Sequence, residues 1–272
     1  MNQEVLCFKE IVNQLKLVPD IQWDPNTEPV LPFDPYNEDK DFLSHYFLLV
    51  ASIDEGNVIG KAINARIIIY ALYKELGSDL FNVFKNLDQI YNILCEIRVN
   101  YGLRLGRLWK YIPEILNSVN TFVMQRHGKL YKWSLNYKKP IYIVNEISNR
   151  IKRMGKTPNS TRKKAWMYMR WMVRPYPDLH VYDHLKPMDL YLPLDRNAAR
   201  TYKKLGVLKS TNNLSWNDVA KVTKWARALY SSDPAIVDYP AFIVGRLLSR
   251  YYGISICEIL SRIKGRGFDN AV

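Results

Sequence analysis

Residues 150–174 read RIKRMGKTPNSTRKKAWMYMRWMVR and contain nine basic residues but no acidic one. Residues 157–161 (TPNST) are typical of a turn, because proline fixes φ and Asn, Ser and Thr side chains can cap the start of a helix. Apolar residues then recur at helical spacing from Ala165 to Val173. The stretch therefore predicts a turn that leads into a helix, with much of the chain's excess positive charge around that turn.

Three basic residues, Arg162, Lys163 and Lys164, fall in the first turn of this predicted helix. The position is unusual, since the positive end of the helix dipole disfavours cations there. One explanation is a nearby anion, and a phosphodiester backbone suits basic side chains at a helix N-terminus. The other is a lysine that loses its proton, since like-charged neighbours and partial desolvation lower a lysine pKa and free the amine to attack carbon.

The composition favours a polyanionic partner. The 272 residues carry a formal net charge of +13, with a pI near 9.5, which points to nucleic acid before a membrane surface. Because 48% of the residues are hydrophobic, the chain can bury a large core as one two-lobed domain or as two small ones.

The three cysteines, Cys7, Cys95 and Cys257, lack the spacing of a disulfide framework, a zinc ribbon or an iron–sulfur cluster, so we expect a reducing compartment. Residues 1–18 have the pattern of an amphipathic helix rather than of a signal peptide. No apolar run has the length of a membrane span. We therefore expect a cytoplasmic, nucleoid-associated protein.

Helical periodicity runs through the chain, while alternating strand-like patterns are almost absent, so we predict an all-α fold. We expect irregular connectors at 18–39, 127–140 and 175–193, and a frayed tail at 265–272. Expected helices cover 1–18, 40–54, 57–76, 79–99, 104–126, 141–153, the segment after the TPNST turn, 196–205, 216–230, 235–252 and 255–264.

Several residues are placed to begin, end or bend these helices. Asn57, Ser215 and Asp233 are expected N-caps, and Gly77 is an expected C-cap. Pro113 is expected to kink the helix that contains it.

An aspartate lies directly before the predicted helix 196–205, in the sequence LPLD that ends at Asp195. An aspartate in this position is most often an N-cap. It lies 195 − 163 = 32 residues after Lys163, which leaves room for one helix and a returning loop. The carboxylate and the amine can therefore reach the same cleft.

Three blocks of sequence, KKAWMYMRWMVR (163–174), LYLPLDRNAAR (190–200) and DPAIVDYPAFIVGR (233–246), resemble the archaeal 8-oxoguanine DNA glycosylases (AGOG) of the helix-hairpin-helix DNA glycosylase superfamily. A related branch of uncharacterised proteins carries a similar RWMVR…LPLD signature. The likeness covers about residues 145–250. Residues 1–140 match only in being helical, apart from a weak sequence similarity at 56–65.

The resemblance implies a single two-lobed domain over 1–272, with the active site in the cleft between the lobes. It divides the chain into a helical N-terminal part (about 1–140) and a hairpin and catalytic part (about 141–264). It also implies an archaeal base-excision repair enzyme that acts as a monomer on double-stranded DNA containing a damaged base, 8-oxoguanine above all.

The resemblance also implies roles for individual residues. Lys163 matches the Schiff-base lysine of the family and Asp195 its catalytic aspartate. Asp238 and Phe242 fall where the family recognises the flipped base, and we group Pro193 of the LPLD loop with them. Two departures are a phenylalanine where the archaeal enzymes typically have tryptophan, and a TPNST turn without the glycines of the usual hairpin.

The chemistry of the residues agrees with these roles. Excision requires the nucleotide to flip out of the duplex, at a cost that contacts to the DNA backbone offset. Asp195 would stabilise positive charge at C1′, and neutral Lys163 would attack that carbon, which leads to β-elimination without metal or cofactor. The expected DNA contacts are Arg150, Lys152, Arg153, Lys156, Asn159, Ser160, Thr161, Arg162 and Lys164.

Other interpretations remain open at this point. Lys163 could be an ordinary phosphate contact, as in a non-catalytic nucleic-acid-binding protein, and Lys164 competes with it as nucleophile. Asp238 and Phe242 could belong to a helix start and to the core. A metal-dependent nuclease is a weaker alternative, resting on His180, His184, Asp178, Asp183, Asp189 and Asp195.

Overall fold

The computed structural model describes residues 2–18, 33–54, 65–77, 87–100 and 110–266, and over these residues the chain is helical without a strand, which confirms the all-α prediction. Within the same residues, no helix combines the length and apolarity needed to cross a membrane. The α-helices are α1 (Gln3–Leu15), α2 (Lys40–Ile53), α3 (Ala65–Leu76), α5 (Leu87–Asn100), α6 (Ile112–Met124), α7 (Leu130–Ser134), α8 (Pro140–Arg150), α9 (Lys163–Val173), α10 (Arg196–Lys204), α11 (Trp216–Leu229), α12 (Asp238–Arg250) and α13 (Ile256–Arg266), and the 3-10 turns are η3 (Pro187–Asp189) and η4 (Pro234–Val237).

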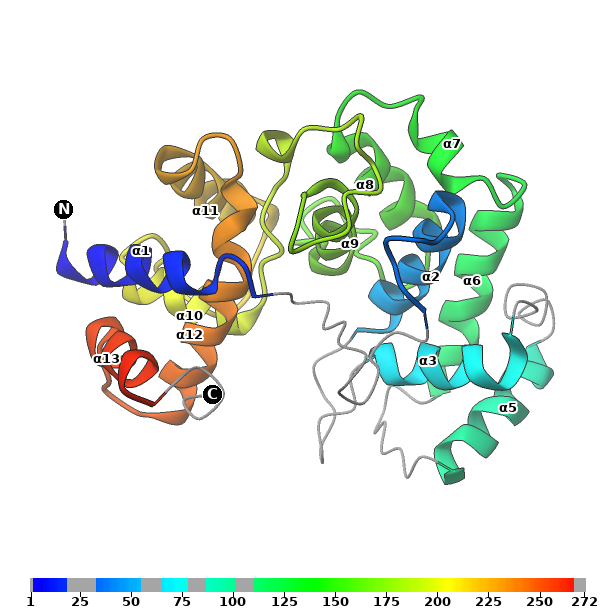
Figure 1. Ribbon diagram of the computed structural model, residues 1–272, viewed down its shortest axis with the longest axis horizontal. Helices are drawn as coiled ribbons and strands as arrows, with labels where there is room; N and C mark the ends of the chain where they lie inside the picture. The colour runs from blue at the N-terminus through cyan, green and yellow to red at the C-terminus, as the bar shows by residue number, and fades with distance from the viewer. Residues whose placement is uncertain (1, 19–32, 55–64, 78–86, 101–109, 267–272) are drawn as a thin grey trace.

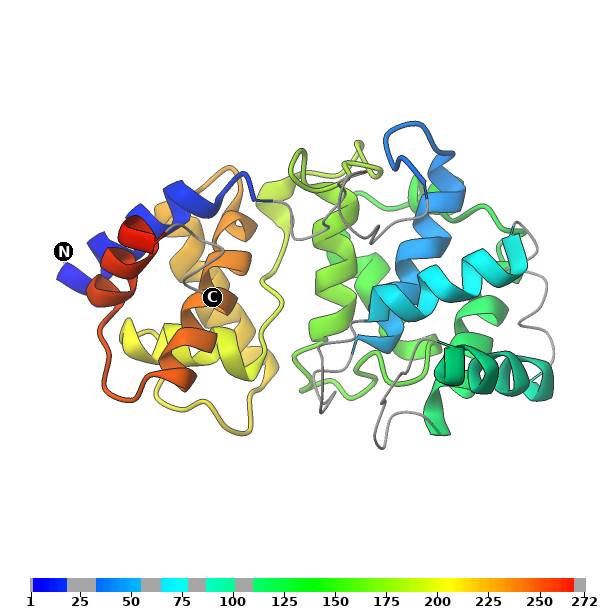
Figure 2. The same cartoon turned by 60° about the horizontal axis from the view of Figure 1, so that its bottom comes forward.

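The helices pack in two groups that lie side by side (Figures 1 and 2). In the first group α2 contacts α3, α6, α7 and α9, and α8 contacts α9. In the second group α10 packs against α12, α1 against α12 and α13, and α11 against η4. The first helix of the chain therefore belongs with the C-terminal helices, and the segment between α9 and α10 leads from one group to the other.

The helix after the TPNST turn, α9, is part of the core. Ten of its eleven residues are buried, because it packs against α2 and α8 and contacts rings from the following segments. The Trp171 ring lies 6.0 Å from that of Phe47 on α2, and the Trp166 ring lies 5.1 Å from that of Tyr191 and 6.2 Å from that of Trp216. The charged residues at the start of α9 are therefore held by a rigid element.

Two predictions about the middle of the chain were wrong. Pro113 lies in the first turn of α6, where its missing N–H is not needed, instead of kinking the helix. The connector 127–140 contains the short helix α7, because Asp41 on α2 accepts hydrogen bonds from the backbone N–H groups of Tyr131 (2.6 Å) and Lys132 (3.4 Å). This cap comes from a residue 90 positions away, so local sequence could not reveal it.

Two helix starts also differ from prediction. Arg162 precedes α9 with a left-handed backbone (φ 51°), so only Lys163 and Lys164 lie in the first turn. Asp233 does not cap the long helix predicted at 235–252, since its carboxylate binds Arg174 (2.8 Å) and η4 intervenes before α12. Gly77 (φ 57°) and the Ser215 cap agree with prediction, whereas Asn57 and the segments 57–64, 79–86, 104–109 and 267–272 lie outside the described residues.

The cysteine spacing, from which we expected a reducing compartment, gave no sign of a disulfide that the structure contains. Cys7 on α1 and Cys257 on α13 are joined by a disulfide, although 250 positions separate them in the sequence. The contact between the two helices also includes a hydrogen bond from the Ile256 N–H to the Glu4 carboxylate (2.7 Å). Spacing rules describe compact cysteine frameworks and say nothing about two ends of a chain that meet in space.

Candidate functional site

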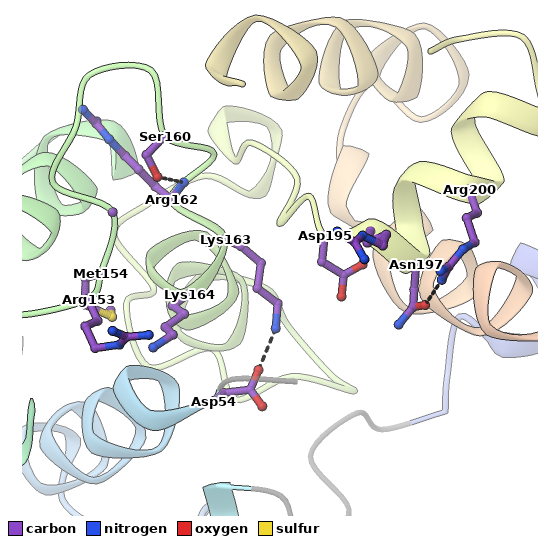
Figure 3. A pocket seen from close by; sticks show the side chains of 12 residues that line it. Asp54, Arg153, Met154, Ser160, Arg162, Lys163, Lys164, Asp195, Asn197 and Arg200 are labelled. Atoms are coloured by element: carbon purple, nitrogen blue, oxygen red, sulfur yellow. Dashed lines mark hydrogen bonds and ion pairs between the residues drawn. The ribbon is translucent and has the colours of Figure 1, made fainter. Parts of the chain in front are cut away.

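A cavity of about 550 Å³ lies where the two groups of helices meet (Figure 3). Its walls come from the end of α2, from the loop between α8 and α9 with the start of α9, and from the start of α10. The basic side chains that line it outnumber the acidic ones, so the cavity favours an anionic ligand. The basic lining residues are Arg153, Arg162, Lys163, Lys164, Arg196 and Arg200, and the acidic ones are Asp54 and Asp195.

The two lysines at the start of α9 are held by the end of α2. The Lys163 Nζ lies 2.7 Å from Oδ2 of Asp54, and the buried Lys164 Nζ donates to the carbonyl of Ser52 (2.7 Å). The carbonyl end of one helix thus meets the amide end of another, and the lysines bind the negative end of α2. A nearby anion, one of the two explanations for these cations, is therefore supplied in part by the chain itself.

The protonation of Lys163 differs from the sequence expectation. Burial lowers the pKa of Lys163, but the carboxylates of Asp54 and Asp195 and the hydrogen bond to Asp54 raise it, and the pKa lies above its usual 10.5. The prediction of a lowered lysine pKa was therefore wrong for the unliganded protein. It considered Arg162 and Lys164 as neighbours but not Asp54, whose Oδ2 lies 2.7 Å from the amine.

Asp195 lies on the wall of the cavity formed by α10, across from Lys163 (Figure 3). It is the N-cap of α10, as its position in LPLD predicts, and its Oδ1 accepts a hydrogen bond from the Ala198 N–H (2.8 Å). This bond orients the carboxylate, and its charge reaches Lys163 strongly enough to raise the pKa of that lysine. The two predicted catalytic residues therefore share one cavity.

The start of α10 is fixed by close packing against α12. A Cβ added to Gly245 would lie 1.8 Å from the Asn197 carbonyl oxygen, so only glycine allows the two helices this approach. Thr201 adds a hydrogen bond from its hydroxyl to the Ala241 carbonyl (2.6 Å). The third sequence block, 233–246, thus positions the second, because Gly245 sets where Asp195 and Asn197 lie.

The loop between α8 and α9 is held by close packing at Gly155 and by backbone hydrogen bonds. Gly155 has φ +93°, and a Cβ there would lie 2.6 Å from the Ser160 hydroxyl and 3.1 Å from Cα of Arg162. The Ser160 N–H donates to the Thr157 carbonyl (3.0 Å), and the Asn159 carbonyl accepts from the N–H of Trp216 (3.0 Å). The loop therefore needs a glycine after all, two positions before TPNST and not within it.

The predicted DNA contacts fall into two sets. Arg153, Ser160, Arg162 and Lys164 line the cavity, whereas the others lie outside its lining. In the outer set Arg150 binds Glu146 (2.9 Å), Lys152 pairs with Glu114, Lys156 and Asn159 are exposed, and Thr161 is half-buried.

The residues predicted to recognise the base are not among those that line this cavity. Asp238 is buried and pairs with Arg170 of α9, which also lies 3.5 Å from Asp178. Phe242 is half-buried with the Arg246 guanidinium 5.9 Å from its ring, and Pro193 is buried. None of the three lines the cavity, and their part in recognition stays a prediction.

The histidines considered as metal ligands bind backbone carbonyls. A ring nitrogen of His180 lies 2.9 Å from the Val173 carbonyl, and one of His184 lies 3.1 Å from that of Ser134. Across the part of the chain that the structure describes, no three His, Cys, Asp or Glu side chains are grouped to hold a metal ion.

Sequence reasoning missed Asp54 and the three residues of α10 that line the cavity beside Asp195, namely Arg196, Asn197 and Arg200. Nothing near Asp54 marks it, because a polar residue after an apolar helix is the ordinary end of such a helix. The α10 residues could have been found, since they follow the LPLD aspartate and share the N-terminal turns of its helix.

Residues 78–246 match the model of the family described as "Protein of unknown function (DUF2400)", and the chain belongs to this family. The match contains every residue that we have named as lining the cavity except Asp54. A search of the curated proteins found no match.

Proposed function

We propose that this member of the DUF2400 family is a DNA glycosylase with AP lyase activity, which removes an oxidised base such as 8-oxoguanine and then cleaves the strand. The observation that carries the proposal is the position of Lys163 and Asp195 on two walls of one basic cavity. The sequence blocks that contain them resemble those of the archaeal 8-oxoguanine DNA glycosylases. An amine and a carboxylate are the two groups that this reaction needs.

The arrangement of the helices supports the proposal. A glycosylase of the helix-hairpin-helix type needs two lobes with the active site between them and a hairpin that contacts the DNA backbone. Here α8, the closed loop and α9 would form the helix-hairpin-helix unit, and the two groups of helices would be the lobes. A cavity of about 550 Å³ has room for one flipped nucleoside.

The charge of the site supports a DNA substrate. Arg153 and Arg162 approach the cavity from the loop, and Arg196 and Arg200 approach it from α10. Basic side chains on both walls can bind phosphates on each side of a flipped nucleotide, and they offset the cost of unstacking, which is a few kcal/mol. A duplex with a damaged base is therefore the proposed partner, bound by one copy of the chain.

Asp195 and Lys163 have different roles in the proposed reaction. As the bond between C1′ and the base breaks, positive charge develops on the sugar, and the Asp195 carboxylate stabilises it. The Lys163 amine attacks C1′, and the resulting iminium acidifies the C2′ hydrogens, so that β-elimination cleaves the strand. Since Lys163 is protonated in the unliganded protein, its proton must leave before or during the attack.

Borohydride trapping tests the proposal. With a duplex that contains one 8-oxoguanine, the wild-type protein should form a covalent adduct in the presence of borohydride, with or without EDTA. Lys163→Gln should form none, and Asp195→Asn should form it much more slowly. Lys204→Gln, which changes a lysine that pairs with Glu4 and does not line the cavity, is the matched control and should behave as wild type. Absence of an adduct with the wild type removes the lyase proposal.

The second candidate is a DNA-binding protein without catalysis, which the raised pKa of Lys163 favours. It predicts salt-dependent duplex binding and no adduct. Lys163→Gln would then change only the slope of log affinity against log salt, by about one unit.

A further inference from the structure

Among the residues that the structure describes, Asp54 is the charged group paired with the proposed nucleophile. Its Oδ2 lies 2.7 Å from the Lys163 Nζ, and both side chains retain partial access to the cavity, with exposed fractions of 29% and 27%. Figure 3 shows the lysine extended toward Asp54, with Asp195 on the other wall. The mechanism above assigns Asp195 to the sugar and gives Asp54 no role.

The backbone around Asp54 fixes the position of its carboxylate. Asp54 ends α2, and its N–H donates to the Ala51 carbonyl (3.3 Å). Two residues before Asp54, the carbonyl of Ser52 accepts a hydrogen bond from the buried Lys164. The end of α2 therefore contacts both lysines at the start of α9. Because Lys164 supplies this structural contact, the pair formed by Asp54 and Lys163 is available for chemistry.

We infer that Asp54 is the proton acceptor that converts the Lys163 ammonium into the attacking amine. The inference rests on the proposed glycosylase and lyase function. An acceptor must lie within hydrogen-bond reach of the proton that it takes, and Asp54 meets this requirement without any movement of the chain. It touches the reacting nitrogen, so it is a catalytic residue in the strict sense.

The proton balance gives Asp54 a defined task. One hydrogen of the ammonium passes to Asp54 while the nitrogen lone pair forms the bond to C1′, and the electron pair of the C1′–N9 bond leaves with the base. Asp54 returns this proton to the departing base. A second hydrogen follows the same path to O4′, as the nitrogen lone pair forms the C=N bond and the C1′–O4′ bond opens. The third hydrogen stays on the iminium nitrogen.

Several other charged groups face Lys163, and none matches this contact. Asp195 is committed to the Ala198 N–H at the start of α10, and Asp238 is paired with Arg170. The other charged side chains that the described residues place around the cavity are cations, which can hold no further proton: Arg153, Arg162, Lys164, Arg196 and Arg200.

The test is the pH dependence of single-turnover adduct formation on the 8-oxoguanine duplex. In the wild type the rate should be nearly constant from about pH 6 to pH 9, because Lys163 stays charged over this range and its proton passes to the carboxylate that it contacts rather than to solvent. In Asp54→Asn the proton must go to solvent. Its rate should be about a hundredfold lower at pH 7 and should rise about tenfold per pH unit toward the wild-type value.

Two further variants separate this role from a structural one. Asp54→Glu keeps a carboxylate and should recover most of the rate at pH 7. Asp183→Asn removes another lysine–aspartate pair of 2.8 Å, the exposed pair with Lys40 outside the cavity, and should leave the profile unchanged. Duplex affinity should not fall in Asp54→Asn, because a negative charge leaves a basic cavity.

The outcomes are distinct. An adduct rate in Asp54→Asn that equals or exceeds the wild-type rate at pH 7 overturns the inference and leaves the proposed function standing. A loss that is the same at every pH, and that glutamate does not recover, also overturns it. No adduct with wild-type protein removes the proposed function, and the role of Asp54 with it.

Discussion

α9 carries cations paired with carboxylates at both of its ends, and the two ends differ in their access to solvent. At its start the open pair, Lys163 and Asp54, is 27% and 29% exposed and lines a cavity. Near its end Arg170 and Asp178 are only 3% and 1% exposed. We refer to the second group as the sealed cluster, which consists of Arg170, Arg174, Asp178, Asp233 and Asp238.

The difference shows that the surroundings of an ion pair decide what it can do. In the sealed cluster the carboxylates come from three segments, so the cluster fixes α12 and the segment after α9 on α9 itself. Cations near a helix C-terminus also suit the dipole. In the open pair a ligand can reach the lysine, and the cation lies at the unfavourable end of the helix. The first arrangement favours stability and the second favours chemistry.

The largest effect should come from opening the sealed cluster. Asp178→Asn removes the buried carboxylate that Arg170 and Arg174 share. The two guanidinium groups keep Asp238 and Asp233 as partners, so the lost charged hydrogen bonds should cost about 3 kcal/mol. Urea unfolding should show this decrease in the free energy of unfolding. The exposed pair of Lys40 and Asp183 provides the control, since Asp183→Asn should cost no more than about 1 kcal/mol. Equal losses in the two variants would remove the distinction between sealed and open pairs.

The next effect concerns the wall that faces the open pair. Gly245→Ala places a methyl group against the Asn197 carbonyl, and we expect a loss of about 1–3 kcal/mol with a shift of α10 that displaces Asp195. Adduct formation should therefore fall further than duplex affinity. Gly265→Ala, on α13, has nothing within 4 Å of the added Cβ and should keep or raise stability. A Gly245→Ala protein with wild-type stability and rate would contradict the packing argument.

The parts of the fold that local sequence controls were predictable. Helical periodicity and capping residues located most of the described helices, and the N-cap at Asp195 follows from one aspartate before a polar helix. The presence of Lys163 and Asp195 in one cavity followed from their spacing and from the resemblance of the surrounding blocks. Each of these inferences needs only residues that are close in sequence or joined by one helix and a loop.

The parts that failed depend on contacts between distant segments. Asp54 lies 109 positions from Lys163, and among the groups that raise the pKa of this lysine its carboxylate has the largest effect. Asp41 caps α7 from 90 positions away, and Cys7 reaches Cys257 across 250. No periodicity or spacing rule contains such pairs, because packing of the two groups of helices creates them. The charge state of a candidate nucleophile is thus a tertiary property.

A smaller effect on stability is expected at the open pair. Lys163→Gln removes a cation that is a quarter exposed, and Asp54 remains close to the other cations of the cavity, Arg153 and Lys164 among them. We therefore expect a loss of at most about 1 kcal/mol in urea unfolding, together with complete loss of the adduct. A loss as large as that of Asp178→Asn would mean that Lys163 has a structural role like that of the sealed cluster.

The smallest effect is the pH dependence of the stability difference between wild type and Lys163→Gln. Its sign follows from the pKa of Lys163. Burial lowers this pKa, but the upward effect of the Asp54 and Asp195 carboxylates is larger than the effect of burial, so the folded value lies above the usual 10.5. A group whose pKa is raised on folding contributes stability that is present below the unfolded pKa and is lost as the pH rises through the folded value. The stability advantage of wild type over Lys163→Gln should thus be constant from pH 6 to about pH 9 and should shrink above about pH 10.5. An advantage that grows with pH would require a lowered lysine pKa, and the open pair would then hold a neutral amine before any DNA is bound.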